Sequence, residues 1–72
     1  MLYCNKGSWK LRCKSDYTRN YITFIHGVEY QVKDKFPGED GTIENGDWEI
    51  KDGRGGLITM NKAERDLIFE EI

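Results

Sequence analysis

The side chains of this 72-residue chain that could do acid–base, nucleophilic or metal chemistry are one histidine, two cysteines and thirteen carboxylates. A serine or cysteine nucleophile needs a base within reach, and His26 is the only histidine in the sequence. It precedes Gly27 between two β-prone runs, where a turn is expected and histidine tolerates an unusual backbone conformation. The carboxylates show no spacing typical of an acid–base pair. We therefore expect a protein that is not an enzyme.

Neither a metal site nor a cofactor is expected from the motifs. Cys4, Cys13 and His26 are too few for a four-ligand zinc site unless carboxylates or a second copy contribute. The glycines at 53, 55 and 56 lack the Lys-Ser/Thr of a phosphate-binding loop, so we interpret them as a turn. Two cysteines in so small a chain favour reduced thiols over a disulfide, and with them a cytoplasmic location.

Length and composition predict one small domain over residues 1–72. Charged residues make up 33% of the chain and apolar residues 38%. No run approaches the roughly 20 apolar residues of a membrane span, so no membrane association is expected.

The charge is unevenly distributed along the chain. Residues 1–35 hold seven Lys/Arg against three acids, a net charge of +4, and residues 36–72 hold four against ten, a net charge of −6. We favour the interpretation that the two halves lie side by side and complement each other, over a dedicated binding face in either half.

Two stretches alternate with the period of a half-buried strand. In residues 9–14, Trp9, Leu11 and Cys13 are predicted to point inward, with Lys10, Arg12 and Lys14 outside. In residues 28–33, three apolar residues alternate with three polar ones. Between these stretches, residues 15–20 are polar and are predicted to form a loop.

The connection around Gly27 has two possible geometries. A two-residue His26-Gly27 hairpin would place Phe24 on the face opposite Tyr30. A type II turn over residues 25–28, with positive φ at Gly27, would splay the two strands and let both aromatic rings reach one core. We prefer the type II turn because it buries more apolar area.

The second half is predicted to contain further short strands. Residues 33–41 are expected to form a loop. Residues 42–44 and 47–51 flank Asn45-Gly46, the strongest short hairpin signal, and residues 57–60 form another strand. Asn61 with Glu64 predicts a helical or 3₁₀ turn over residues 61–66. For residues 67–72 a last strand is narrowly favoured over a longer helix. The fold class is therefore all-β, a small barrel of five to seven short strands.

Four motifs in order along the chain resemble those of SH3 domains. Residues 22–32 are similar to the diverging turn of that family, Asp16-Tyr17 to its Asp-Tyr pair, Asp47-Trp48 to its Asp-Trp motif, and residues 56–61 to its closing G-L-I-P-x-N segment. The resemblance covers about residues 11–63 and implies an SH3-like β-barrel. A bare barrel of this size is also similar to small accessory proteins of bacteriophages.

The resemblance implies a non-enzymatic protein-binding module, and its phage-type version an inhibitor or modulator of a host protein in the host cytoplasm. Binding would be anchored by Trp48 and Tyr17, with Asp47 and Glu49 on the rim. This implies an exposed Trp48; the alternative, equally favoured, is that Trp48 packs across the sheet with Ile43. Because Ser15, Thr59 and Lys62 replace two tyrosines and a proline of the family's ligand groove, proline-rich peptide binding is a less favoured alternative.

Three other hypotheses stay open. Lys10, Arg12, Lys14 and Arg19 could form a nucleic-acid-binding strip with nearby tyrosines. An acidic face could instead engage a basic host protein, through Glu39, Asp40, Glu44, Asp47, Glu49 and Asp52. Two copies could also pair as a homodimer through residues 67–72.

Overall fold

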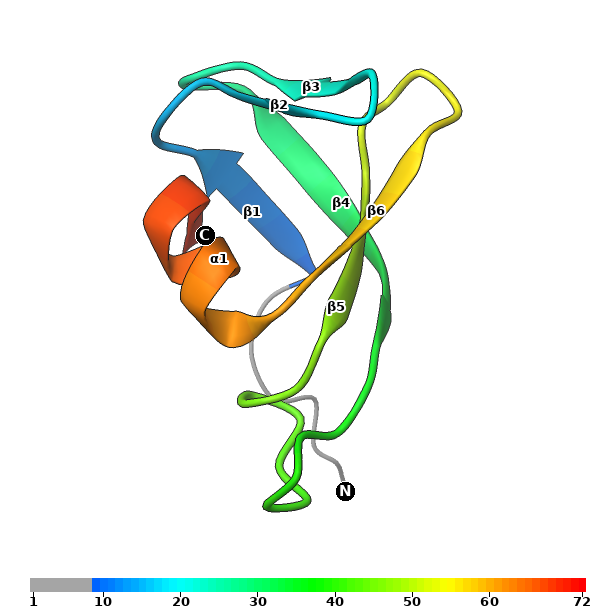
Figure 1. The fold of residues 1–72 in the computed structure, drawn as a ribbon. Coiled ribbons are helices and arrows are strands. Elements are labelled where there is room, and N and C mark those ends of the chain that lie inside the picture. The colour runs from blue at the N-terminus through cyan, green and yellow to red at the C-terminus, as the bar shows by residue number, and fades with distance from the viewer. Residues whose placement is uncertain (1–8) are drawn as a thin grey trace.

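A computed structural model describes residues 9–72, which are mostly β-structure with one short helix. The elements in chain order are β1 (Lys10–Cys13), β2 (Tyr17–Arg19), β3 (Ile22–Phe24), β4 (Glu29–Lys35), β5 (Trp48–Lys51), β6 (Leu57–Met60), α1 (Lys62–Ile68) and β7 (Phe69–Glu71) (Figure 1). The prediction of several short strands with a short helix near the C-terminus is confirmed for this part of the chain. The helix has seven residues and ends at Ile68, so residues 67–72 divide between helix and strand.

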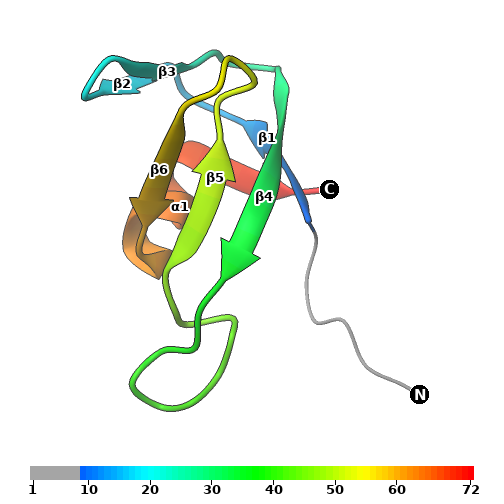
Figure 2. The ribbon, with the colours of Figure 1, turned by 90° about the vertical axis from the view of Figure 1, so that its right-hand side faces the viewer.

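The strands form two antiparallel sheets. Five strands make one sheet in the order β6-β5-β4-β1-β7, and β2 pairs with β3 in a separate hairpin. Strand β1 therefore lies between β4 and the last strand, with Leu11 opposite both Tyr30 and Glu71. The hairpin crosses one end of the molecule, whereas the connection between β4 and β5 projects from the other (Figures 1 and 2).

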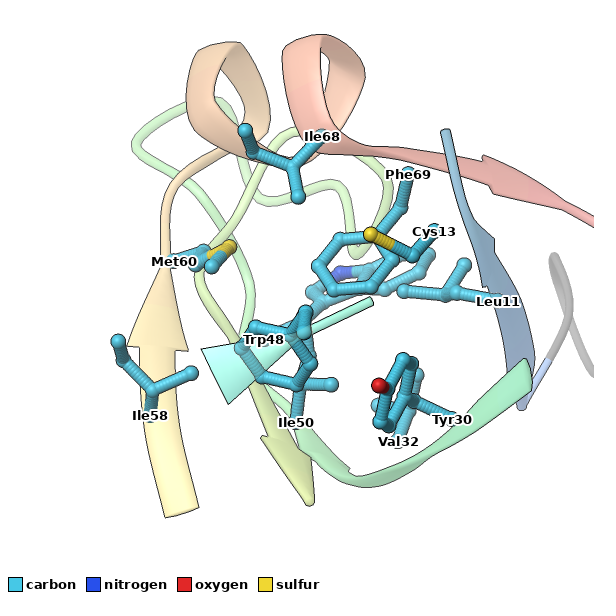
Figure 3. Packing of buried hydrophobic residues seen from close by; sticks show 11 residues of the cluster. Leu11, Cys13, Tyr30, Val32, Trp48, Ile50, Ile58, Met60, Ile68 and Phe69 are labelled. Atoms are coloured by element: carbon cyan, nitrogen blue, oxygen red, sulfur yellow. The ribbon is translucent and has the colours of Figure 1, made fainter. Parts of the chain in front are cut away.

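The core is built from the alternating strand residues that the sequence indicated. Each of β1, β4, β5 and β6 turns every second side chain inward, and α1 and β7 add Ile68 and Phe69 (Figure 3). The eleven buried apolar residues are Leu11, Cys13, Phe24, Tyr30, Val32, Trp48, Ile50, Ile58, Met60, Ile68 and Phe69. Trp9, predicted to be in the core, is 42% exposed because it precedes the first described strand.

The turn at Gly27 has the geometry predicted for splayed strands. Gly27 has φ +88°, and the Val28 N–H donates to the Ile25 carbonyl at 3.1 Å. Strand β3 pairs only with β2, and β4 pairs with β1 and β5. Because β3 and β4 diverge, Phe24 and Tyr30 meet edge to face with ring centroids 4.8 Å apart. The alternative His26-Gly27 hairpin is wrong.

The predicted loop at residues 15–20 contains strand β2 instead. Cross-strand pairing runs from Tyr17–Phe24 to Arg19–Ile22, and two residues close the hairpin. Those residues, Asn20 and Tyr21, have φ of 53° and 66°. Positive φ at both positions is typical of a type I′ turn, which usually takes glycine where Tyr21 stands.

The hairpin predicted at Asn45-Gly46 is wrong. A local turn does form, since the Gly46 N–H donates to the Ile43 carbonyl at 3.2 Å. However, the flanking residues 42–44 form no strand, and the partner of Trp48 in β5 is Lys35 of β4. Residues 36–47 are therefore one long connection, which we call the acidic loop. Long-range contacts to this loop outweigh the local Asn-Gly preference.

Candidate functional site

Trp48, expected to be either an exposed binding anchor or packed with Ile43, is buried. Its side chain is 2% exposed, and its indole N–H donates to the Ile43 carbonyl at 2.9 Å. The Lys35 ammonium lies 4.0 Å from the ring centroid, and the Arg65 guanidinium carbon lies 3.9 Å from it. The ring is thus used in cation–π contacts within the domain, and the prediction of an exposed anchor at this residue is wrong.

Tyr17 belongs to a polar network that fastens the β2–β3 hairpin. Its hydroxyl donates to Glu64 Oε2 at 3.1 Å, and the Arg19 guanidinium donates to the same oxygen at 2.7 Å. Arg19 also donates to the Thr59 carbonyl at 2.8 Å, on edge strand β6. The network joins the hairpin to both α1 and β6, and Tyr17 is half-buried in it. Neither Tyr17 nor Trp48 is a free platform for a polyproline ligand.

The two acids predicted for the rim of the anchor lie in different elements. Asp47 is exposed at the end of the acidic loop, where its carbonyl accepts the Phe36 N–H at 2.9 Å. Glu49 lies in β5, and its carboxylate is 4.0 Å from the Lys33 ammonium. Because Trp48 is buried and the Tyr17 hydroxyl is bonded to Glu64, these two acids do not flank an exposed Trp48.

The basic strip is largely neutralised by carboxylates. Lys10 and Arg12 lie 3.9 Å and 3.3 Å from Glu29, and Arg12 lies 3.8 Å from Glu70. Arg19 pairs with Glu64. Of the four basic residues, only Lys14 has no ion pair within residues 9–72. This arrangement agrees with the expected charge complementarity between the halves, because Arg12 and Arg19 meet acids from the second half.

The six acids considered as one acidic face lie in different elements of the fold. Glu39, Asp40, Glu44 and Asp47 lie together on the acidic loop, which contains no lysine or arginine. Asp52 instead lies in the β5–β6 turn, where its side chain accepts the N–H groups of Arg54 and Gly56 at 2.7 and 2.8 Å. These two bonds hold the pKa of Asp52 below its usual value.

The acidic loop is held to the domain by Arg65. This side chain is 5% exposed and donates to the Gly46 carbonyl at 2.8 Å and to the Glu44 carbonyl at 2.6 Å. Burial lowers the pKa of Arg65, but an arginine stays protonated at neutral pH. Together with the Trp48 bond to Ile43, these contacts fix the carbonyl groups of residues 43, 44 and 46 of the loop.

A second set of bonds fixes the loop from within. The Asp40 carboxylate accepts the N–H and hydroxyl of Thr42 at 3.0 and 2.8 Å and the side-chain amide of Asn45 at 2.7 Å. The Thr42 N–H, then the Asn45 amide and the Thr42 hydroxyl, hold the pKa of Asp40 below its usual value. Gly46 packs against the Phe36 carbonyl so closely that a Cβ atom there would collide with it. The loop is therefore ordered despite its length.

The outer surface of the acidic loop is not used by the rest of the domain. Phe36 is 45% exposed. The carboxylates of Glu39, Glu44 and Asp47 are exposed, and none forms an ion pair with any residue from 9 to 72. Residues from both ends of the loop, among them Phe36, Glu39 and Asp47, line a depression of about 290 Å³.

Among residues 9–72, His26 and Cys13 are the side chains considered for nucleophilic chemistry. His26 is exposed, and its backbone N–H donates to Asp16. Cys13 is a free thiol in the core, with its pKa raised chiefly by burial. Within the described part, no group of three or more His, Cys, Asp or Glu residues could hold a metal ion. No helix there could span a membrane. Cys4 lies outside the described residues.

Comparisons with known proteins add no identification. No protein-family model, no curated protein and no solved structure matches the chain.

Two residues of the candidate surface were not singled out from the sequence. Arg65 follows the Asn61 cap by four positions and shares a helix face with Ile68, a spacing that could have placed it inward. Phe36 stands beside the only proline, where an aromatic residue outside any strand could have indicated a contact surface. Neither signal is specific, because charged residues in helices and aromatic residues near turns are common.

Proposed function

We propose that this chain is an SH3-like β-barrel that acts as a non-enzymatic protein-binding module. The fold assignment is supported by the strand order β6-β5-β4-β1-β7, by the divergence of β3 and β4 at Gly27, and by a short helix that leads into a last strand beside β1. Along the chain, these structural features occur in the same order as the sequence motifs that resemble the SH3 family. Fold alone does not define function, so the proposed binding rests on a surface.

The observation that carries the proposal is the acidic loop. It has twelve residues without a strand or helix, and connections of that length in compact domains usually have a function or are disordered. This loop is held by Arg65, Trp48 and Asp40, so it is ordered. Its outward side chains nevertheless contribute nothing to the core. A rigid, unpaired surface of this kind is suited to binding, because little entropy is lost on association.

The charge of the loop indicates the class of partner. Four acids and no basic residue in twelve positions create a negative field that would steer a basic protein surface toward it. Such a partner surface could itself bind nucleic acid, which the loop would then displace. Direct nucleic-acid binding by this chain is disfavoured because the carboxylates beside Lys10, Arg12 and Arg19 already compensate the basic strip. The phage-type version of this function is inhibition of a bacterial host protein.

The proposal can be tested by affinity capture from a bacterial lysate with three forms of the chain. The loop variant E39Q/E44Q/D47N removes three charges from the acidic loop, and the control E29Q/D66N/E70Q removes three exposed charges outside it. Wild type and control should capture the same protein, and the loop variant should lose it. Capture should also weaken as salt rises, because exposed charges are screened. Equal capture by all three forms, or no specific capture at all, would refute the proposed function.

A further inference from the structure

We propose that the depression on the acidic loop binds an arginine side chain of the partner protein. This inference rests on the proposed function and adds the chemistry of the contact. The depression lies between the two ends of the loop, and Phe36, Pro37, Glu39 and Asp47 contribute to its lining. An exposed aromatic residue, a proline and two exposed acidic residues thus line one hollow.

The shape of the depression depends on close backbone contact between its two sides. Gly38 and Gly46 form part of the lining, and a Cβ atom on either glycine would collide with backbone of the opposite segment. The Phe36 N–H donates to the Asp47 carbonyl at 2.9 Å, which fixes the two ends relative to each other. Arg65 holds the Gly46 carbonyl from beneath. The hollow therefore exists before any ligand arrives.

The carboxylates of Glu39 and Asp47 are available to a ligand. Asp40, their neighbour on the loop, already accepts three hydrogen bonds from Thr42 and Asn45. By contrast, Glu39 and Asp47 form no side-chain hydrogen bond or ion pair with residues 9–72. Arg65 interacts with Asp47 only through the electrostatic field, without a hydrogen bond or an ion pair. A cation in this hollow would therefore meet two exposed acidic residues and an aromatic residue.

Arginine fits this combination better than lysine does. A guanidinium is planar, stacks on an aromatic ring and donates two parallel hydrogen bonds to a carboxylate. Its apolar stem can lie along Phe36 and Pro37 while the charged end reaches the acids. A lysine ammonium is more strongly hydrated and offers no flat surface to the ring. An anionic ligand is excluded by the same two carboxylates.

The test is an NMR titration of the ¹⁵N-labelled chain with three peptides that differ only in the residue type at two positions. The probes are Ac-Gly-Arg-Gly-Arg-Gly-NH2 and the same peptide with lysine or with citrulline, which keeps the shape of arginine without its charge. The arginine peptide should shift the amides of residues 36–39 and 45–47 in a saturable manner. The lysine peptide should bind more weakly, and the citrulline peptide should cause no shift.

Variants make the assignment specific. E39Q/D47N should weaken binding of the arginine peptide by about tenfold, and F36A should weaken the arginine peptide more than the lysine peptide. E29Q/E70Q, with the same change in net charge, should bind like wild type. Shifts spread over all exposed acids, or equal binding of arginine and lysine peptides, would overturn the arginine site. The lysate capture could still succeed in that case, so failure of this inference is distinguishable from failure of the proposed function.

Discussion

Replacing Arg65 by methionine should destabilise the domain strongly. The substitution keeps an apolar stem but removes donors to the Glu44 and Gly46 carbonyls and the cation beside Trp48. Hydrogen bonds from a charged group contribute roughly 1.5–3 kcal/mol each, and a desolvated cation–π contact about 1–2 kcal/mol. Methionine recovers part of this by packing, so we expect a loss of about 3–5 kcal/mol.

That loss is a large part of the stability available to so small a domain. At roughly 0.05–0.15 kcal/mol per residue, a domain of this length is stable by only about 4–11 kcal/mol. Urea unfolding followed by tryptophan fluorescence should therefore show a midpoint lower by about 3 M or more, for a slope of about 1 kcal/mol/M. Arg65→Lys, which keeps the charge and one donor direction, should lose less and remain measurable if the methionine variant does not fold.

Lys62→Met provides the matched control on the same helix. Lys62 forms an exposed pair with Asp66 at 2.8 Å, and pairs of this kind contribute up to about 0.5 kcal/mol. Hydrogen exchange should further distinguish changes at Arg65 from the Lys62→Met control. Arg65→Lys should speed exchange of the loop amides at Thr42 and Gly46, whereas the control should not. If Arg65→Met unfolds at the same urea concentration as Lys62→Met, the proposed role of Arg65 in holding the loop is wrong.

Three further predictions concern strain, pH and thiol reactivity. Tyr21→Gly should stabilise the fold by roughly 0.5–1 kcal/mol, because relief of the left-handed conformation exceeds the entropy cost of glycine. The control Thr18→Gly, in the extended part of the hairpin, should destabilise the fold. A lower melting temperature for Tyr21→Gly than for wild type would contradict the strain argument. Asp40 and Asp52 have lowered pKa values in the folded state, so the stability they contribute is complete above about pH 4 and is lost as the pH falls further. The Asp52→Asn variant should accordingly be less stable than wild type at pH 7 and should lose less stability on acidification. If its unfolding depends on pH as that of wild type does, the Asp52 carboxylate does not contribute to the pH dependence. In a Cys4→Ser variant, Cys13 should react with Ellman's reagent only on unfolding, because its side chain is 1% exposed and burial raises its pKa. Rapid labelling of Cys13 in native buffer would instead show that the core opens.

The sequence predicted the core and one turn well because both depend on local pattern. Alternation in β1, β4, β5 and β6 assigns inward and outward residues directly. The diverging turn was predictable because only one geometry brings Phe24 and Tyr30 into the same core, and that geometry requires positive φ at Gly27.

The candidate surface could not be predicted because it depends on contacts between distant residues. Asn45-Gly46 predicts a hairpin locally, yet Arg65 and Phe36, which lie nineteen and ten positions away from Gly46, determine how the loop is held. The sequence left Trp48 open between an exposed and a packed position. It is an inward-facing residue of β5 in the core, and Lys35 and Arg65 lie against its ring. Charge composition alone likewise did not indicate which acids are paired and which are free.

The central proposal, that the acidic loop is the binding surface, is tested most directly by mapping the contact on the chain itself. The ¹⁵N-labelled chain would be mixed with the purified protein that wild type captures and the E39Q/E44Q/D47N variant does not, and the amide signals that shift or broaden would be assigned. We predict that the affected amides cluster in residues 36–47, with little change in the outer face of β1, β4 and β7. Changes confined to that outer face, or to the β2–β3 hairpin tip, would contradict the proposal.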